Sequence, residues 1–497
     1  MTARTASSAD MMLRDHLENP RGLGDLERSP HSGAAGGAVC GDLIRMSVRL
    51  SDGRVAEAGF QASGCATARA AGSATVELVQ GASLLEAGLL APDAVASELG
   101  GLSPAPRHAA ELAVDALHRA IGMAARDGAA RLPRSGRRTL VAMSGGVDSA
   151  AAARLALDAG EQVVGVTLEL WSDPATDGER SCCSPQAVTG ARSLAQRMGI
   201  PHFTLDLRED FRVAVVDRFL DGYAEGRTPN PCVGCNGSVR FGSMLGLADR
   251  LGAARLVTGH YARIADDGHG PLIRAAADPA KDQSYVLARL REEEIARLRF
   301  PLGELEKPRV RELARAAGLE VADKPESQDL CFLAGGDTRA FMRRHGGHSL
   351  RAASAGGDIV DSEGSVLGRH GGHHTFTVGQ RRGLGLGAAE PLYVLRKDAR
   401  RNRVVVGPRA ALLAERVRLA PVELHRPANA VGAVRVRYHA ATVPCTVDPD
   451  LPAGRHESVE LRLARPVGAA APGQTGCLMA GDLVVGWGLV ADPFVDG

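Results

Sequence analysis

The sequence predicts a multidomain protein: an α+β unit, an α/β unit with a parallel sheet, a small β-rich unit and a C-terminal β-barrel. Three observations lead to this fold class. At 497 residues, the chain exceeds the size of one ordinary hydrophobic core. Apolar strand-like runs alternate with helical periods through its middle, which is typical of βαβ units. Beyond about residue 346 the helical periods stop, and short β-rich runs separated by turns follow.

The first unit, residues 1–125, combines strands with helices and is predicted to be α+β. Its predicted elements span 42–50, 55–61, 67–80 and 107–124. The following stretch, 126–138, is rich in Arg, Gly and Pro and has no apolar periodicity. Such a composition predicts a linker between two folded units.

The second unit, residues 139–346, shows the alternation of a parallel sheet. Its predicted strands span 140–143, 163–168, 202–205 and 255–259. Its predicted helices span 150–157, 187–198, 213–225 and 243–251. In such a fold a nucleotide binds at the carboxyl ends of the strands.

The remaining chain divides into a small β-rich unit, 347–408, and a β-barrel, 409–497. The runs that predict strands are 393–395, 404–406, 433–438, 460–463 and 483–488. Short strands with frequent turn residues are typical of barrels and sandwiches.

Composition narrows the class of protein. A net charge of +1 argues against a globally basic nucleic-acid binder but permits a basic face on one domain. No apolar run is long enough to span a membrane, so no membrane partner is expected. Nine scattered cysteines are too few for a disulfide framework and are expected to be cytoplasmic thiols. Basic residues are nearly all Arg; the only lysines are Lys281, Lys307, Lys324 and Lys397.

The segment Ser144–Ser149, Ser-Gly-Gly-Val-Asp-Ser, directly follows an apolar strand and precedes a helix. Backbone N–H groups and the positive end of a helix favour an anion at such a turn. Its glycines allow close approach of a phosphate, and its serines add hydroxyl donors. No Gly-Lys-Ser/Thr follows, so this is not the Walker loop of NTPases. The pattern resembles the PP-loop of ATP pyrophosphatases, which transfer AMP to a substrate oxygen.

Two cysteine-containing motifs are the second indication of function. Residues 228–236 have the sequence Thr-Pro-Asn-Pro-Cys-Val-Gly-Cys-Asn, and two prolines stiffen that loop around Cys232 and Cys235. Cys331 lies in Ser-Gln-Asp-Leu-Cys-Phe, far away in sequence. A stiff loop can hold a thiol at a fixed distance, and a reactive thiol has to be a thiolate. The other cysteines of the second half are expected to be buried small hydrophobes: Cys182, Cys183, Cys445 and Cys477.

Seven motifs occur together in order: 144–149, 181–184, 228–236, 258–263, 281–285, 327–332 and 374–385. From about Thr139 to the C-terminus the chain resembles MnmA, the family of tRNA-specific 2-thiouridylases. The resemblance implies that the oxygen on carbon 2 of the wobble uridine attacks the α-phosphate of ATP, with Mg²⁺ present, and releases pyrophosphate. The tRNAs for Lys, Glu and Gln are the implied substrates.

The resemblance also implies how sulfur arrives. Cys331 would carry a persulfide supplied by a cysteine desulfurase or a sulfur relay protein. The terminal sulfur would then replace AMP at carbon 2. Cys235 matches the catalytic nucleophile and would close a disulfide with Cys331, which has to be reduced before the next turnover.

Matching residue by residue gives the implied binding positions. Those for ATP are Ala142, Met143, Ser144, Gly145, Gly146, Val147, Asp148, Ser149, Leu168 and Gly259. Those for tRNA are Asn230, Pro231, Cys232, His260, Lys281, Asp282, Gln283, Arg437, Tyr438 and Gln474.

Cys232 is a departure, because many family members have Asp there, and a general base at this position is in doubt. It creates Cys-x-x-Cys with Cys235, so Cys331 would be a third thiol of one site. Three thiolates can hold a [4Fe–4S] cluster with one open iron. The cluster mechanism therefore stays open beside the persulfide–disulfide mechanism. Structural zinc is a weaker alternative there, because no second Cys-x-x-Cys is present.

The N-terminal unit resembles the IscU/NifU-like iron–sulfur scaffolds. The matching positions are Asn19–Gly24, Cys40–Asp42, Gly64–Ala66 and His108. The resemblance implies metal ligation by Cys40, Asp42, Cys65 and His108, but Ala109 occupies the third cysteine position. A labile iron–sulfur cluster, zinc, or a docking platform for a desulfurase are the three open roles, beside an inert fused fold.

Two other functions remain as alternatives. One is another PP-loop adenylating enzyme, such as an amide-forming synthetase, although these lack the paired cysteine motifs. The other is a non-catalytic iron–sulfur carrier whose PP-loop half only binds tRNA. Release of pyrophosphate that depends on tRNA would distinguish an enzyme from a carrier.

Overall fold

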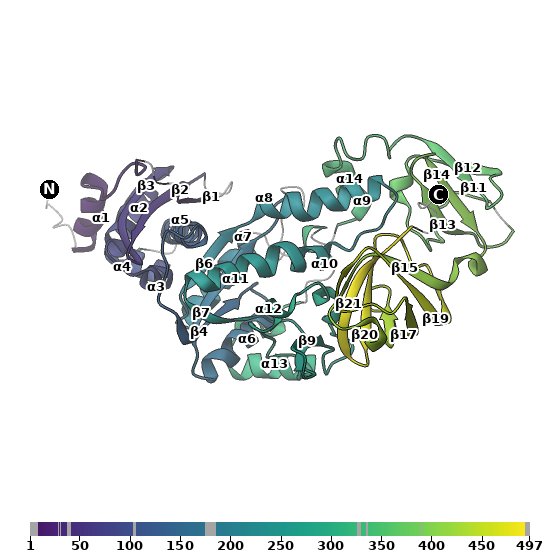
Figure 1. The fold of residues 1–497 in the computed structure, drawn as a ribbon. Helices are drawn as coiled ribbons and strands as arrows, with labels where there is room; N and C mark the ends of the chain where they lie inside the picture. Colours follow the sequence, from purple (N-terminus) through teal and green to yellow (C-terminus); the bar gives the residue numbers. More distant parts are fainter. Residues whose placement is uncertain are drawn as a thin grey trace.

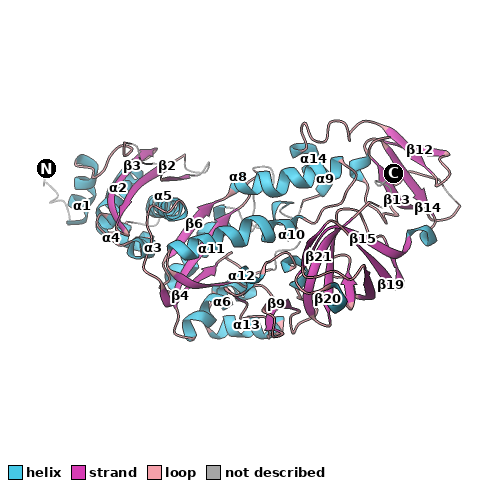
Figure 2. Ribbon diagram, viewed as in Figure 1, coloured by secondary structure: helices cyan, strands magenta, loops and turns pink. Residues whose placement is uncertain are grey.

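The structure, a computed structural model, describes residues 8–27, 29, 31–36, 41–102, 106–173, 185–325, 330–333, 336–387 and 389–492. Figure 1 shows three regions side by side: an N-terminal unit, a central α/β unit and a pair of β units. Figure 2 shows helices concentrated in the first two regions and strands in the last. The predicted fold class is confirmed.

The N-terminal unit is a three-stranded antiparallel sheet, in the order β1-β2-β3, packed against helices. Its elements are α1 (Ser8–Glu18), β1 (Ser32–Gly36), β2 (Leu43–Ser51), β3 (Arg54–Ser63), α2 (Ala66–Val79), α3 (Leu84–Leu89), α4 (Pro92–Glu98) and α5 (Arg107–Arg126). Asp52 and Gly53, both with positive φ, form the turn of the β2–β3 hairpin. The long helix α5 lies against β1 and β2. Gly33 permits this approach, because a Cβ there would meet the backbone of Ala116.

The central unit contains a five-stranded parallel sheet in the order β10-β7-β4-β5-β6. Its strands are β4 (Ser135–Ala142), β5 (Gln162–Glu169), β6 (His202–Asp206), β7 (Ala253–Val257) and β10 (Leu298–Arg299). Its helices near the sheet are α6 (Val147–Asp158), α7 (Pro185–Arg197), α8 (Arg208–Phe211), η1 (Arg212–Asp217), α9 (Arg218–Ala224), α10 (Pro231–Cys235), η2 (Asn236–Arg240) and α11 (Phe241–Arg250). Strand β5 is almost entirely buried, which explains its near-continuous apolar sequence.

Two long helical rods cross the central unit. α8, η1 and α9 run on from one another between Arg208 and Ala224, and α10, η2 and α11 do so between Pro231 and Arg250. The middle segment of each rod, η1 and η2, is π-helical. Such turns inside α-helices are frequent at functional sites. The smaller elements that follow are β8 (Arg263–Asp266), β9 (Pro271–Arg274), η3 (Ser284–Leu287), α12 (Glu292–Ile295), α13 (Lys307–Ala316), η4 (Glu320–Asp323), η5 (Cys331–Leu333) and α14 (Thr338–His345).

The N-terminal unit is docked on the central unit rather than tethered loosely to it. α5 packs against β6, the edge strand of the parallel sheet. On α5, Arg119 forms a bidentate ion pair with Glu169 of β5, and Asp115 pairs with Arg192 of α7. All four side chains are largely or fully buried. The contact therefore includes buried charge as well as apolar surface.

The segment between the two units is short and packed. α5 continues through Arg126 and β4 begins at Ser135, so the described chain between them is residues 127–134. Within it, the backbone N–H of Leu132 donates to the carbonyl of Arg250 over 2.8 Å. Ser135 N likewise donates to the carbonyl of Gly252 over 2.9 Å. The composition predicts a linker at 126–138, whereas Arg126 ends α5 and β4 already begins at Ser135. The bonds described here hold the residues between them against the end of α11.

The β units follow the predicted order. The first is a four-stranded sheet, β12-β11-β14-β13, and the second belongs to a nine-stranded sheet that closes where β15 pairs with β21. The first unit contains β11 (Gly357–Val360), β12 (Val366–His370), η6 (His373–Thr375), β13 (Tyr393–Asp398) and β14 (Arg403–Gly407). The second contains η7 (Arg409–Leu412), β15 (Leu413–Leu424), η8 (Ala428–Ala430), β16 (Ala433–Arg435), β17 (Val443–Asp448), β18 (Gly454–His456), β19 (Val459–Gly468), β20 (Thr475–Ala480) and β21 (Leu483–Val490).

Two details of this region differ from the expected pattern. The strand expected at 433–438 ends at Arg435, and His439 has a positive φ of 57°, so Arg437 and Tyr438 lie in a turn. The hairpin β8–β9, which belongs to the central stretch of sequence, extends the sheet of the barrel by pairing β9 with β21. Among the helices that the structure describes, none has both the length and the apolar character needed to cross a membrane.

Candidate functional site

The loop Ser144–Ser149 lies where β4 ends and α6 begins. Gly145 has a φ of +69°, and Gly146 is the N-cap residue of α6. The hydroxyl of Ser149 accepts hydrogen bonds from the backbone N–H of Ser144 over 3.1 Å and from its hydroxyl over 3.2 Å. The turn is therefore closed on itself, with the N-terminus of a twelve-residue helix behind it.

Neighbouring strands bring the other predicted ATP residues to the same edge of the sheet. β4 lies between β5 and β7, and all three strands are parallel. Leu168 is at the carboxyl end of β5, and Gly259 comes two residues after β7. A Cβ on Gly259 would lie 2.8 Å from the backbone nitrogen of Ser149, so only glycine permits this contact. This arrangement matches the nucleotide site of open parallel sheets.

Two lysines support the loop Ser144–Ser149 by hydrogen bonds. Lys307, at the start of α13 and buried, donates from Nζ to Asp148 Oδ1 over 2.7 Å and to Oδ2 over 2.8 Å. The hydroxyl of Tyr261 donates to the same Oδ1 over 2.8 Å. Lys324 Nζ donates to the carbonyl of Gly145 over 3.0 Å. These bonds fix the carboxylate of Asp148 and the orientation of the Gly145 peptide.

The short helix α10 carries the first two thiols of interest. Asn230 is its N-cap, and its Oδ1 accepts from the backbone N–H of Cys232 over 3.0 Å and of Val233 over 3.2 Å. Pro231 occupies the first turn, where a missing N–H costs nothing. Cys232 is half-buried and Cys235 is only 5 % exposed. Their i, i+3 spacing places both on one side of the helix.

Cys331 begins η5, whose position is fixed by its neighbour Phe332. The ring of Phe332 packs against those of Phe211 and Phe219, with centroid distances of 6.0 and 5.4 Å. These two aromatics flank η1, and η1 is the segment on which α10 packs. Both thiol-bearing segments therefore rest on the same helical rod, although they are far apart in sequence.

No disulfide joins the cysteines of the described residues. The expected bond between Cys235 and Cys331 is thus not a feature of this structure, which has both residues as thiols. The sulfurs of Cys232, Cys235 and Cys331 are also not gathered within 4.8 Å of one another, as the ligands of a single ion would be. Cys182 and Cys183 lie outside the described residues, whereas Cys445 and Cys477 are buried in the barrel as expected.

Two of the residues expected to bind tRNA, Asp282 and Gln283, form hydrogen bonds within the protein. Asp282, 7 % exposed, accepts from the backbone of Ala276 and Ser284, from the Ser284 hydroxyl and from Arg435. Gln283 Oε1 accepts from the backbone N–H of Tyr261 over 2.9 Å. These side chains shape the loop beside the nucleotide edge, and Lys281 precedes them on the same loop.

His260 lies in an apolar setting. Its ring is 5.7 Å from that of Phe241 and 6.1 Å from that of Phe300. Burial lowers its pKa to about 3, with the nearby charge of Arg240 acting in the same direction. The imidazole is consequently neutral at pH 7, and its Nδ1 is bonded to the hydroxyl of Thr258 over 2.8 Å.

Three expected tRNA residues come from the barrel. Arg437 is exposed, and Tyr438 lies 5.9 Å from the ring of Tyr285. Burial raises the pKa of Tyr438, and the nearby carboxylate of Asp282 and thiol of Cys232 add to this shift. Tyr438 therefore lies close to α10, the helix that carries Cys232 and Cys235 and is called here the thiol helix. Gln474 donates to the carbonyl of Thr228, so it too reaches the cysteine loop.

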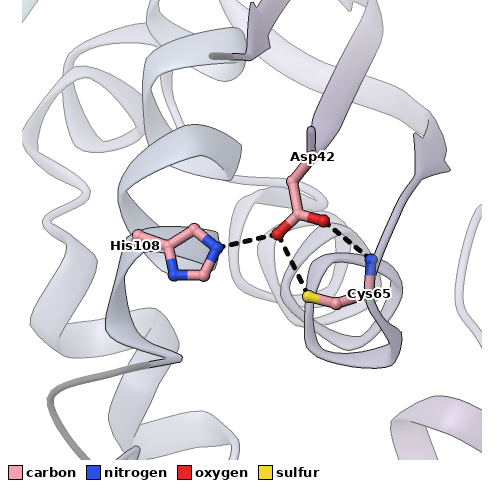
Figure 3. A group of neighbouring side chains, drawn as sticks. All are labelled: Asp42, Cys65 and His108. Atoms are coloured by element: carbon pink, nitrogen blue, oxygen red, sulfur yellow. Dashed lines mark hydrogen bonds and ion pairs between the residues drawn. The ribbon is translucent and has the colours of Figure 1, made fainter. Parts of the chain in front are cut away.

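A second constellation lies in the N-terminal unit (Figure 3). Asp42, Cys65 and His108 bring one ligand atom each within 4.8 Å of the others. Asp42 Oδ2 accepts from Cys65 Sγ over 3.1 Å and bonds to His108 Nε2 over 2.7 Å, while Oδ1 accepts from the Cys65 backbone N–H. The Cys65 backbone bond is the largest cause that lowers the pKa of Asp42, followed by His108.

This donor set fits a borderline-soft metal ion. A carboxylate oxygen, a thiol sulfur and an imidazole nitrogen that already converge are ligands that zinc accepts in tetrahedral sites. The fourth expected ligand, Cys40, lies outside the described residues. Ala109, fully buried on α5, supplies no ligand in place of the missing cysteine. The residues present thus fit a mononuclear ion directly and a cluster only with fewer thiolates than usual.

Four family models match the chain. They are the NifU-like N terminal domain over residues 9–128, and the tRNA methyl transferase HUP domain over 137–335. The tRNA methyl transferase PRC-barrel domain matches 349–408, and the aminomethyltransferase beta-barrel domain matches 415–490. Their order agrees with the order of the units described above.

One curated relative matches nearly the whole chain, and others match its larger part. The bifunctional protein NifU/MnmA of Rubrobacter xylanophilus is 44% identical over 490 residues, which are 96% of this chain and 97% of the relative. The chain belongs to the bifunctional NifU/MnmA family. The tRNA-specific 2-thiouridylase MnmA of Magnetococcus marinus is 43% identical over 360 residues, 71% of this chain and 98% of its own. The resemblance of both halves is therefore confirmed.

A solved 4-thiouridine synthetase in complex with RNA and bound ATP aligns over 43% of this chain and 51% of its own. The identity is 20% and the TM-score 0.27, too low to add to what family membership establishes.

In this NifU/MnmA chain, several site residues escaped the motif comparison. Lys307, Lys324 and Arg435 all contact predicted site residues. One signal pointed to two of them: the chain has only four lysines, and a lysine retained in so Arg-rich a sequence marks a place that suits a compact ammonium group. Arg435 carried no signal, because one arginine among many is not distinctive.

Proposed function

We propose that this chain is an ATP-dependent tRNA 2-thiouridylase that replaces the oxygen on carbon 2 of the wobble uridine by sulfur. The observation that carries the proposal is the anion-binding loop at the carboxyl edge of the sheet, with Leu168 and Gly259 on the strands to either side. Membership of the NifU/MnmA family gives the loop its substrate class. Cytoplasmic tRNAs for Lys, Glu and Gln are the proposed substrates.

The first half-reaction uses the loop. The uridine oxygen attacks the α-phosphorus of ATP, a bond forms between them, and pyrophosphate leaves with the electrons of the broken P–O bond. Loop N–H groups and the α6 N-terminus stabilise the negative charge that gathers on the phosphates. Mg²⁺ bound with ATP would share that charge. The carbonyl oxygen, a poor leaving group, has become part of AMP, a good one.

The second half-reaction uses the thiols. Cys331 is proposed to hold a persulfide delivered by a cysteine desulfurase or relay protein, and its terminal sulfur bonds to carbon 2 as AMP leaves. The thiolate of Cys235 is then proposed to attack the Sγ of Cys331: the S–S bond to the transferred sulfur breaks, its electron pair stays with the sulfur on carbon 2, and a Cys235–Cys331 disulfide forms. Two electrons from an external thiol reductant then restore both residues for the next cycle. The common helical rod under both segments supports their acting together.

A [4Fe–4S] cluster is the alternative that Cys232 favours. Cys232 and Cys235 share one side of α10, and they with Cys331 would hold it, leaving one iron open to bind hydrosulfide. For the N-terminal unit we propose metal binding by Asp42, Cys65 and His108, with Cys40 as a further ligand. Docking of a desulfurase on the same unit would bring the sulfur source to the enzyme.

Nucleoside mass spectrometry tests the proposal. The anaerobically purified full chain is incubated with tRNA, ATP, Mg²⁺ and an active desulfurase, and 2-thiouridine is measured for wild type, Cys232→Ser, Cys235→Ser and Cys331→Ser. Absence of 2-thiouridine from wild type, with tRNA-dependent pyrophosphate release also absent, would contradict the enzyme and favour a carrier. If Cys232→Ser keeps activity while the other two lose it, the persulfide route stands. If Cys232→Ser is inactive like the other two variants, yet still binds ATP, the cluster route is favoured.

A further inference from the structure

The segment 224–230, called here the cysteine loop, connects α9 to α10 and so leads directly into Cys232 and Cys235. Its backbone is held from the small β unit at two points. His373 Nε2 donates to the carbonyl of Ala224 over 3.0 Å. Lys397 Nζ donates to the carbonyl of Arg227 over 3.2 Å.

The barrel holds the next residue of the same loop. The backbone N–H of Thr228 donates to the carbonyl of Pro472 over 2.7 Å, and Gln474 Nε2 donates to the carbonyl of Thr228 over 2.8 Å. Gly473, with a φ of +86°, brings the barrel close: a Cβ there would lie 3.2 Å from the Thr228 nitrogen. Two separate β units thus bond to adjacent peptides, those of Arg227 and Thr228.

The two side chains that the small β unit contributes are themselves buried, and His373 is 2 % exposed. Lys397 is 5 % exposed and its ammonium group lies 5.1 Å from the centre of the Tyr223 ring. Burial lowers the pKa of Lys397 to about 7, so the amine loses part of its charge near neutral pH. A lysine is costly to bury where packing alone is needed, and an apolar residue would fill the space without that cost. The amine is present because it reaches the Arg227 carbonyl.

The contacts that hold the cysteine loop also affect the position of the thiols on α10. Thr228 is followed by Pro229, the cap Asn230 and Pro231, a run with little conformational freedom. A displacement of the Thr228 peptide is therefore transmitted to the start of α10. Cys235 is 5 % exposed, so its sulfur has to become more accessible before it can react beside an RNA base.

We propose that Lys397 and Gln474 are positioning residues that hold the cysteine loop, and that RNA bound across the two β units releases the thiol helix through them. This inference rests on the proposed function, because it takes tRNA as the ligand of the β units. Gln474 has one amide group, and that group donates to the carbonyl of Thr228. RNA that binds the same amide weakens the bond between Gln474 and the loop. RNA then binds the protein with the loop released better than the protein with the loop held, and such a difference in affinity is what any ligand-driven change requires.

Thiol alkylation of the full-length protein tests this. Iodoacetamide is added with and without unmodified tRNA, and peptide mass spectrometry gives the rate at Cys235. In wild type we expect tRNA to raise this rate about tenfold, because thiol reactivity follows exposure. In Lys397→Met and Gln474→Ala, we expect the alkylation rate at Cys235 to be about tenfold higher than in wild type without tRNA. Adding tRNA to these variants should then raise the rate less than about twofold.

Two controls make the result specific. Arg401→Met removes an exposed cation from the same β unit without touching the cysteine loop, so its alkylation profile is expected to match wild type. Cys477, fully buried in the barrel with its pKa raised to about 12 by burial, reports on folding within each sample. A variant in which Cys477 stays unreactive has kept its barrel, and its Cys235 rate is then interpretable.

The inference would be overturned if the alkylation rate at Cys235 were unchanged in both Lys397→Met and Gln474→Ala while Cys477 stayed unreactive. It would also be overturned if tRNA bound to wild type without changing that rate. Formation of 2-thiouridine by wild type in parallel separates the two hypotheses. If 2-thiouridine forms and the rates do not change, the inference fails and the proposed function stands. If the variants expose Cys235 but wild type forms none and binds no tRNA, the proposed function fails.

Discussion

Asp115 of α5 and Arg192 of α7 form a buried ion pair across the boundary between the N-terminal and central units. Arg192 is 1 % exposed, and Asp115 also accepts from Arg119, which in turn holds Glu169. A loose tether would raise the local concentration of a sulfur source beside the thiols. This pair instead fixes the N-terminal unit in one orientation on the edge of the parallel sheet.

Removing the carboxylate should loosen that docking. Asp115→Ala leaves the Arg192 guanidinium buried without its partner, and breaking a buried pair in this way costs about 3–5 kcal/mol. We expect the free energy of opening of α5 and β6, measured by native-state hydrogen exchange, to fall by that order. Arg154→Ala is the matched control: it removes an exposed pair with Asp158, worth less than about 1 kcal/mol. Equal effects of the two variants would contradict a stabilising role for the buried pair.

Acid should weaken the same boundary. His118 of α5 and His202 of β6 are fully buried, with ring centroids 6.0 Å apart. Burial, followed by the charge of Arg192, lowers the pKa of both, that of His202 to about 3. Between about pH 6.5 and 3 the unfolded chain therefore binds more protons than the folded chain. Stability is complete above about pH 6.5 and falls as the pH is lowered below it.

The expected loss by pH 5.5 is about 1.4 kcal/mol for each histidine. Hydrogen exchange of α5 at pH 7.5 and 5.5, corrected for intrinsic exchange rates, measures it. His118→Leu should reduce the pH dependence and stabilise the boundary, because leucine removes the desolvation cost of a fully buried imidazole. An identical pH profile in wild type and His118→Leu would exclude His118 as a contributor.

Lys307→Met tests the support behind the nucleotide loop. The substitution leaves the Asp148 carboxylate, which lies in the first turn of α6 within the loop, without its cation. Charge-assisted bonds are worth about 1.5–3 kcal/mol, so we expect ATP affinity to fall roughly 10- to 100-fold. Isothermal titration of ATP at fixed Mg²⁺ measures the change. Adding Asp148→Asn to Lys307→Met should recover part of the affinity; a further loss would contradict the repulsion argument.

The sequence could predict local features better than the contacts between units. Strands such as Val163–Leu168 and helix Arg107–Ala124 follow from apolar periodicity and lie within β5 and α5. The loop Ser144–Ser149 was also predictable, because glycine and serine between a strand and a helix have a local physical meaning. The short strands β8 and β9 were not, since, among the described strands, β8 pairs only with β9, and β9 pairs with β21, some 200 residues later in the chain.

The same limit applies to the site. Cys235 and Cys331 could be singled out from their motifs. No local pattern indicates that Phe332 anchors Cys331 on the rod α8–η1–α9, against which α10 packs. Lys397 illustrates this further. Its role depends on the Arg227 carbonyl, a backbone group that every residue has and that composition therefore cannot reveal.

Metal binding by the N-terminal unit gives the last prediction. His108→Ala removes one of three converging donors and should lower zinc affinity at least about tenfold, as measured by competition with a chromophoric chelator. His31→Ala is the control, because His31 lies in the same unit but pairs with Asp127 rather than with Asp42. Ala109→Cys restores a thiol next to His108 and should strengthen binding and favour a cluster over a single ion. If wild type binds no zinc and Ala109→Cys does, the missing cysteine has silenced the site, and the N-terminal unit acts through its docking surface alone.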